Sequence, residues 1–339
     1  MARPTLSPPG PVRIAAWPDL FRQGWRMLLR RRESAALILL LAIAGLLSLL
    51  RRSLFTWSDL TSIARSFSWI AVAAFGESIA IIIGGVDLSV SSVMALAGLI
   101  SALAMRAGIP VPLAILCGLL CGGLVGWLNG MLVGRVQMPP FIVTLAMMVI
   151  VRGVVSILTG GWPVLDLPVG FLALGQSDLP LGLVSVPMPT IIMLGVAVVL
   201  GLFMGRTVLG AHIYALAHSE RALRVSGVDT VRVKVFVYTL SGIMAACGGL
   251  LMTARLGVAL PTAATGYEWD VIAAAVVGGT SLFGGRGSIL GVFLGAALVQ
   301  MLHSSFVLLG LPTYLRPVVL GTMVLLFLLF DRWRQQRGL

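Results

Sequence analysis

The chain has 339 residues, of which 58% are hydrophobic and only 11% are charged, with a mean hydropathy of +1.04. In soluble globular proteins roughly a quarter of all residues are charged, so the composition excludes a soluble domain and indicates an integral membrane protein. The formal net charge of +12 does not favour nucleic-acid binding here, because the arginines cluster between apolar runs, as in the inner loops of membrane proteins.

The first 34 residues are rich in proline and arginine and precede the first apolar run. Trp17, Phe21 and Trp25 recur at helical spacing within them. The segment is therefore predicted to be a basic cytoplasmic tail that is either disordered or forms a helix lying on the inner leaflet.

The apolar runs between residues 35 and 331 are continuous, which favours membrane helices over a barrel. A spanning helix needs about 20 apolar residues, so this single transmembrane domain has room for about ten of them. The predicted fold is an all-α integral membrane protein, followed by a tail over 332–339. The predicted spans are 35–50, 66–83, 88–105, 111–133, 140–159, 188–204, 234–255, 268–283, 287–309 and 314–330.

The two longest connections differ in charge and predict the orientation. The loop over 205–233 contains four arginines, whereas the connection over 160–187 has neither lysine nor arginine. By the positive-inside rule the first loop is cytoplasmic and the second is external, so both termini are predicted to be cytoplasmic.

Glycines spaced four residues apart predict close helix packing in two spans. They are Gly118, Gly122, Gly126, Gly130 and Gly134 in one, and Gly287, Gly291 and Gly295 in the other. The segments 82–100 and 276–296 also resemble each other, since each has a glycine pair before a helix rich in small residues. This suggests an internal duplication, with chance similarity between two apolar segments as the alternative.

The stretch "IIIGGVDLSVSS" interrupts two apolar runs. Gly84 and Gly85 are suited to end one helix, while Asp87 and Ser89 are suited to cap the next. The aspartate is therefore predicted to lie at a tight helix break, packed in protein or facing water.

Ionisable residues inside spans often mark transport pathways. Four candidates for a substrate path follow from this rule: Glu77, Arg152, Glu268 and Asp270. A structural ion pair between Glu77 and Arg152 explains these two residues equally well. Glu268 and Asp270, at the start of the span 268–283, are explained equally well by helix capping or by docking of a partner protein.

The cytoplasmic loop over 205–233 contains a capping pattern. Ser219 is suited to cap a short helix over 220–226, Gly227 to end it, and Asp229 to cap the next span. Such a short rigid helix suits the transfer of force from a partner protein, although an ordinary basic loop is an equally good reading of the residues alone.

Four segments, in this order, resemble the permease subunits of bacterial ATP-binding-cassette importers for ribose and related sugars, including autoinducer 2. They are "GGVDLSVSSVMALAG", "MPPFIVTLAMMVIVRG", "YALAHSERALRVSGVDTVRVKVFVYTLSGIMAACGG" and "GYEWDVIAAAVVGGTSLFGGRGSILG". Departures from the family pattern include Ser91, Glu77 and "AHSERA".

The resemblance implies a permease subunit in the bacterial inner membrane that moves a monosaccharide or related polyol. Its implied partners are two ATPase subunits, a second copy or a similar permease, and a soluble binding protein. The chain has no G-x-x-x-x-G-K-[ST] motif, so ATP is expected to bind the ATPase partner, with no cofactor in this chain. The implied ATPase-coupling residues are Ser219, Glu220, Arg221, Arg224 and Gly227.

Two other functional classes compete with this one. An ion-driven secondary transporter of a small polar solute would use intramembrane acids such as Glu77 and Asp87 and would need no ATPase. A membrane enzyme would need a convergent nucleophile, base or metal set, and no H-E-x-x-H or G-x-S-x-G pattern occurs, so no catalytic or metal-binding residue is predicted.

Overall fold

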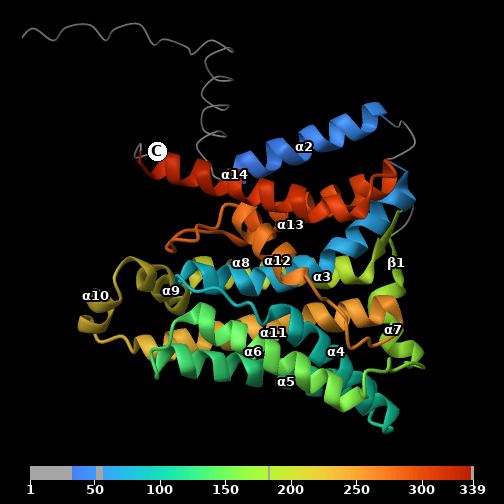
Figure 1. Cartoon of the computed structure of the whole chain (residues 1–339), viewed down its shortest axis with the longest axis horizontal. Coiled ribbons are helices and arrows are strands. Elements are labelled where there is room, and N and C mark those ends of the chain that lie inside the picture. Colours follow the sequence, from blue (N-terminus) through green and yellow to red (C-terminus); the bar gives the residue numbers. More distant parts are fainter. Residues whose placement is uncertain (1–32, 51–55, 182–183, 337–339) are drawn as a thin grey trace, which may run out of the picture.

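A computed structural model describes residues 33–50, 56–181 and 184–336, so the tail predicted over 1–34 lies almost wholly outside the described part of the chain. Most of the described chain is helical (Figure 1). The elements are α2 Glu33–Leu50, α3 Trp57–Ile82, α4 Val90–Arg106, α5 Val111–Gly134, α6 Pro140–Thr159, α7 Val169–Gln176, β1 Asp178–Leu181, β2 Val184–Pro187, α8 Met188–Arg206, α9 Val208–His218, α10 Glu220–Val225, α11 Thr230–Leu256, α12 Tyr267–Val277, α13 Ile289–Leu308, the 3-10 turn η1 Thr313–Leu315 and α14 Arg316–Gln336.

The long helices lie side by side and give the molecule two opposite ends (Figure 1). One end holds α9 and α10 and is called the α10 end. The other holds α7 and the strands β1 and β2, and is called the hairpin end.

Six helices in the described residues are long and apolar enough to cross a membrane: α3, α5, α6, α8, α11 and α13. Shorter apolar helices lie in α2, α4, α9 and α14. Every predicted span coincides with a helix, which confirms a helical membrane protein, while ten complete crossings stay a prediction.

Two helix boundaries differ clearly from the prediction. Helix α3 begins at Trp57 instead of residue 66, because the Thr56 side chain caps the Asp59 backbone N–H and starts the helix within polar sequence. Helix α12 ends at Val277 instead of residue 283, because Gly279 has a φ of +94° and stops the helix. With 11 residues, α12 is about 16 Å long and cannot cross a bilayer core alone.

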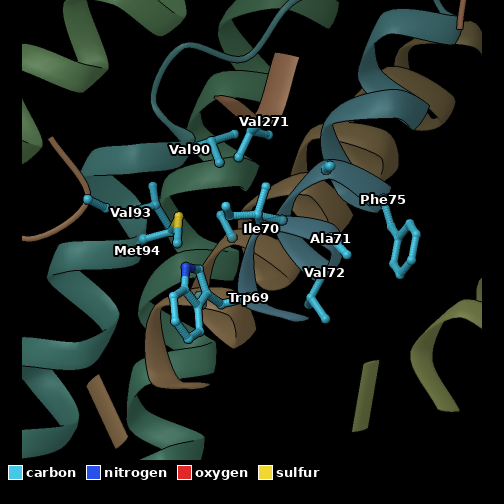
Figure 2. Close-up of a cluster of buried hydrophobic side chains, with 14 of the residues drawn as sticks. Trp69, Ile70, Ala71, Val72, Phe75, Val90, Val93, Met94 and Val271 are labelled. Carbon is cyan, nitrogen blue, oxygen red and sulfur yellow. The ribbon is translucent and has the colours of Figure 1, made fainter. Parts of the chain in front are cut away.

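Helix α11 lies at the centre of the bundle and packs against α3, α4 and α5. The glycine repeat of α5 permits this contact: a Cβ at Gly126 would collide with the carbonyl of Tyr238, and one at Gly130 would lie 2.6 Å from Cα of Val235. The prediction of close glycine packing is therefore confirmed. Figure 2 shows the adjoining apolar core, where Ile70 of α3 lies beside Val90 of α4 and Val271 of α12.

Outer helices expose apolar side chains, as a lipid-facing surface requires. Ile157 of α6 is 81% exposed and Val199 of α8 is 64% exposed. Further exposed apolar residues on α5, α6, α8 and α14 include Leu120, Val149, Val198, Leu325 and Leu329. The chain is therefore a multi-pass membrane protein.

The connection over 160–187 contains structure that the sequence did not predict. It forms α7 and an antiparallel hairpin in which Asp178 pairs with Pro187 and Leu181 with Val184. Arg65 of α3 donates to the Gln176 carbonyl at 3.0 Å and forms an ion pair with Asp178, which fixes the hairpin to the helix bundle.

Candidate functional site

The break between α3 and α4 is a tight backbone turn. Gly84 has a φ of +81°, and its N–H donates to the Ile81 carbonyl while the Gly85 N–H donates to the Ala80 carbonyl. These are the paired hydrogen bonds of a helix end with a left-handed residue. The glycines end α3 as the sequence predicted.

Asp87 is the centre of a buried polar cluster at this break, which we call the Asp87 cluster (Glu77, Asp87, Ser89, Asn129 and Ser241). Its side chain is 1% exposed. One carboxylate oxygen accepts from the Ser89 N–H at 3.0 Å and from the Ser89 hydroxyl, and the other accepts from the Ser241 hydroxyl at 3.1 Å. Asn129 donates to the Ser89 hydroxyl at 3.0 Å. The cluster thereby joins the break to α5 and α11.

The predicted capping of α4 differs in detail. Ser89 is the residue before the helix, but its side chain makes no capping hydrogen bond; Asp87 instead accepts the Ser89 N–H. The prediction that Asp87 is packed in protein is confirmed by its burial. Its partners on α5 and α11 carry no local sequence signal, since they are 42 and 154 residues away along the chain.

Glu77 is fully buried in α3, and one of its carboxylate oxygens accepts from the Asp87 backbone N–H at 3.0 Å. Its other oxygen has no hydrogen-bond partner among the described residues. Glu77 therefore ties the break to α3, the helix that precedes it. It has no hydrogen bond or ion pair with Arg152 among the described residues.

Arg152 and Glu268 belong to a different part of the molecule. Arg152 of α6 donates to the Ala263 carbonyl at 2.6 Å and to that of Pro261 at 3.4 Å, and it interacts electrostatically with Glu268. A structural ion pair between Glu77 and Arg152 is therefore wrong. Arg152 is instead bound by backbone carbonyls of the loop after α11, which is more than 100 residues away along the chain, and not by the carboxylate of Glu77.

Asp270 is the fourth predicted residue of the substrate path, and it lies at the centre of a cluster of ionisable side chains. It is 4% exposed and accepts from Arg316 of α14 at 3.0 Å, while His303 of α13 lies 3.1 Å from its other oxygen. We call these residues the Asp270 cluster. Asp270 thus ties together the starts of α12 and α14 and the end of α13.

At the α10 end, the predicted short helix forms as expected. The Ser219 hydroxyl accepts from the Ala222 N–H at 3.1 Å, and Gly227 ends the turn with a φ of +84°. The side chain of Asp229 accepts from the Arg232 N–H and caps α11. These residues confirm the capping prediction, although they do not test what binds here.

Glu220 anchors α10 to α11. Its carboxylate accepts from Lys234 at 2.8 Å, from Arg224 at 2.8 Å and from the Thr230 hydroxyl at 3.1 Å. The hydrogen bond from Lys234 is the main cause that lowers the pKa of Glu220 from its ordinary value. Arg221, by contrast, is exposed on the same short helix.

A second break, between α12 and α13, contacts both the first break and α9. The Gly285 N–H donates to the Ile82 carbonyl at 2.8 Å, and the Tyr214 hydroxyl of α9 donates to the Gly287 carbonyl at 2.8 Å. A Cβ at Gly285 would lie 2.9 Å from the His218 ring. The sequence predicted a resemblance between the two segments but gave no sign that they touch.

Both breaks begin with the same helix ending. Gly279 donates to the Val276 carbonyl and Thr280 to that of Ala275, as Gly84 and Gly85 do at the first break. The hydrogen bonds therefore align Gly84 with Gly279, whereas the alignment of the two sequence segments pairs Gly84 with Gly278. The likeness is therefore one of backbone geometry as well as composition.

Comparison with known proteins gives a consistent result. Residues 60–328 match the family described as the permease component of branched-chain amino acid transport systems. The chain is 37% identical over 322 residues to the ribose import permease protein RbsC of Escherichia coli K12, covering 93% of this chain and 97% of that protein.

Two further relatives have other names. The D-allose transport system permease protein AlsC of Escherichia coli K12 is 34% identical over 297 residues, which cover 87% of this chain and 89% of that protein. The autoinducer 2 import system permease protein LsrC of Yersinia enterocolitica is 32% identical over 311 residues, which cover 92% and 85%. No solved structure matches this chain.

Proposed function

This chain belongs to the family of branched-chain amino acid transport system permease components, and from that premise we propose that it is the permease subunit of an ATP-binding-cassette importer. The solute proposed is a monosaccharide or a related small polyol, because the relatives are named for ribose, D-allose and autoinducer 2. The observation that carries the proposal is similarity over 93% of this chain and 97% of a ribose permease.

The proposed location is the bacterial cytoplasmic membrane, with the α10 end inside and the hairpin end outside. The basic loop that contains α9 and α10, and the absence of lysine and arginine from residues 160–187, support this orientation. Both termini are then cytoplasmic, and a single transmembrane domain extends over 35–331.

The proposed contact with the ATPase is the segment over 217–228. Two observations support it: α10 is braced by Glu220, and α9 touches the second break through Tyr214 and His218. A displacement of α10 therefore has a continuous packed route through α9 to the glycine breaks inside the bundle.

The proposed partners are two ATPase subunits, a second permease copy or a similar permease, and a soluble solute-binding protein at the hairpin end. ATP is proposed to bind the ATPase alone, because this sequence has no phosphate-binding loop motif. The chain itself is proposed to have no catalytic role.

The experiment that tests the proposal is sugar uptake into proteoliposomes. The chain is reconstituted with its proposed ATPase and binding-protein partners, and uptake of labelled D-ribose, D-allose and D-xylose is measured with ATP or a non-hydrolysable analogue inside. We expect uptake of at least one sugar that requires ATP hydrolysis and persists when an ionophore removes ion gradients.

The opposite dependence identifies the rival function. Uptake by the chain alone that is driven by a proton or sodium gradient, and is abolished by the ionophore, would show an ion-coupled secondary transporter. Liposomes that contain the ATPase and binding protein without this chain serve as the control.

A further inference from the structure

A polar pocket of about 340 Å³ lies at the hairpin end, where α3, α13 and the starts of α12 and α14 meet. Small-molecule sites typically measure roughly 300–1,000 Å³, so this volume suits a compact ligand. We call it the α3–α13 pocket. Its wall includes Ser62, Ser66, Trp69, Gln300, His303 and Ser304.

The polar residues come from one face of each of two antiparallel helices. Ser62 and Ser66 are four residues apart on α3, and Gln300 and Ser304 are four apart on α13, so each pair lies on a single side of its helix. The rings of Phe67 and Phe293, 5.5 Å apart between centroids, hold the same two helices together further from the hairpin end.

The hydroxyls of this pocket have spare hydrogen-bonding capacity. Within the described part of the chain, no hydrogen bond engages the Ser62 or Ser66 hydroxyl. Gln300 donates to the Ser304 hydroxyl only at 3.4 Å, a long contact, and its carbonyl oxygen has no described partner. Together these groups offer both donors and acceptors to a bound molecule.

The charged residues around the pocket already have partners. Arg316 and His303 both face Asp270, and the carboxylate of Asp59 at the rim accepts from the Thr56 hydroxyl. The indole ring of Trp69 adds an aromatic surface that is 8% exposed. Neutral hydrogen-bonding groups, charged groups that already have partners and one aromatic wall together suit an uncharged polyhydroxylated molecule better than an ion.

A neighbouring pocket offers a useful contrast. It is larger, about 760 Å³, and lies on the other side of Arg316 between α12 and α14. Its wall is mostly apolar, with Ile272, Leu320 and Val324 among the lining residues. Its hydroxyl-bearing lining residues are Thr265, Tyr267 and Thr313, and no glutamine or asparagine lines it.

We propose that the α3–α13 pocket is a binding site for a single monosaccharide within the permease itself. This inference rests on the proposed function and goes beyond it, since it gives the permease a direct contact with the solute. Ser62, Ser66, Gln300 and Ser304 bind the sugar hydroxyls, and Trp69 lies against its apolar face. The Asp270 cluster positions the helices that form the walls.

The test compares the complete importer with a Ser66→Ala/Gln300→Leu double variant in proteoliposomes, using D-ribose, D-allose and D-xylose as probes. We expect the number of sugar molecules taken up per ATP hydrolysed to fall about tenfold, because several solute hydrogen bonds are lost. ATP hydrolysis without binding protein should be unchanged. Ser156→Ala/Thr159→Ala on α6 is the matched control, since these hydroxyls bond only within their own segment.

A second measurement detects binding directly. Ser66→Cys, placed in a background with Cys117→Ala, Cys121→Ala and Cys247→Ala, is labelled with a membrane-impermeant thiol reagent in the presence and absence of each probe sugar. We expect the transported sugar to slow labelling at least threefold, while labelling of Ser156→Cys in the same background stays unchanged.

The outcomes separate the two proposals. A wild-type importer that takes up none of the sugars overturns the proposal that its solute is a monosaccharide and the pocket assignment with it. Wild-type uptake together with an unchanged sugar-to-ATP ratio in the double variant, or with no protection of Ser66→Cys, overturns the pocket assignment alone.

Discussion

The two helix breaks of this protein have the same ending and different contents. Each begins with a left-handed glycine and the same pair of backbone hydrogen bonds. The first is then filled by Asp87, which Ser241 of α11 binds directly and Asn129 of α5 holds through the Ser89 hydroxyl. The second is a glycine-rich loop whose contacts to α9 are made by its backbone.

The difference indicates that the two breaks have different roles. A buried carboxylate with several hydrogen-bond donors fixes a chain segment, because moving it would leave polar groups without partners. A loop held by backbone contacts and by close approach of small residues can move with the helix it touches. We therefore expect changes at the first break to affect folding, and changes at the second to affect transport.

Asp87→Ala should have the largest effect. It leaves the Ser241 hydroxyl and both the N–H and the hydroxyl of Ser89 without their acceptor inside the bundle, which costs about 3 kcal/mol of folding free energy. We expect a strong fall in folded protein, measured by fluorescence-detected size-exclusion chromatography. A stable variant with altered sugar preference would show instead that the first break takes part in selection.

Replacing Arg221 and Arg224 together with alanine should release the ATPase while leaving the fold intact. These residues are exposed at the α10 end, and the ion pair between Arg224 and Glu220 is worth less than about 1 kcal/mol. We expect co-purified ATPase to fall more than tenfold. Arg232→Ala is the charge-loss control; equal ATPase recovery from all three proteins would place the contact elsewhere.

Gly285→Ala and Gly84→Ala test the two breaks against each other. Both residues have positive φ, +76° at Gly285 and +81° at Gly84, so each substitution costs about 1–2 kcal/mol of backbone strain. Only at Gly285 would the new Cβ also press on His218, at 2.9 Å from its ring. At equal amounts of folded protein we expect about fivefold slower ATP-driven uptake for Gly285→Ala, and near-normal uptake for Gly84→Ala.

Glu77→Gln should change little. The amide oxygen of glutamine accepts the Asp87 N–H as the carboxylate does, so the first break keeps its hydrogen bond. We expect uptake within twofold of wild type at equal membrane expression. A selective loss of uptake with normal folded yield would support the original prediction that Glu77 lines the substrate path.

The smallest expected effect is the pH dependence of the α10 anchor. Because the folded-state pKa of Glu220 is lowered, its contribution is complete above the ordinary value of 4.5 and is lost as the pH falls through the folded-state value. The protection factors of residues 219–226, which are corrected for the intrinsic pH dependence of amide exchange, should therefore fall only below the ordinary pKa of 4.5. Glu220→Gln should remove that dependence; a fall in protection already at about pH 6 in the wild type would contradict it.

Much of the architecture was predictable because membrane helices leave strong local signals. Continuous apolar runs gave the helix positions, and the Ser219, Gly227 and Asp229 caps were found because capping acts within a few residues. The start of α3 was missed because polar residues after Thr56 hid a helix that a cap begins. The end of α12 was missed because apolar composition outweighed the signal of Gly278 and Gly279.

The sequence by itself determined that this is a helical membrane protein, where its helices lie, and that its resemblance is to sugar permeases. Only the tertiary structure decided which polar groups meet: Asp87 with Ser241, Asp270 with His303 and Arg316, and the two serines of α3 with Gln300 across a pocket. The physical reason is the distance along the chain over which each interaction acts. Hydrophobic runs and caps act along one helix, whereas buried polar partners are chosen by packing between helices that are distant in sequence.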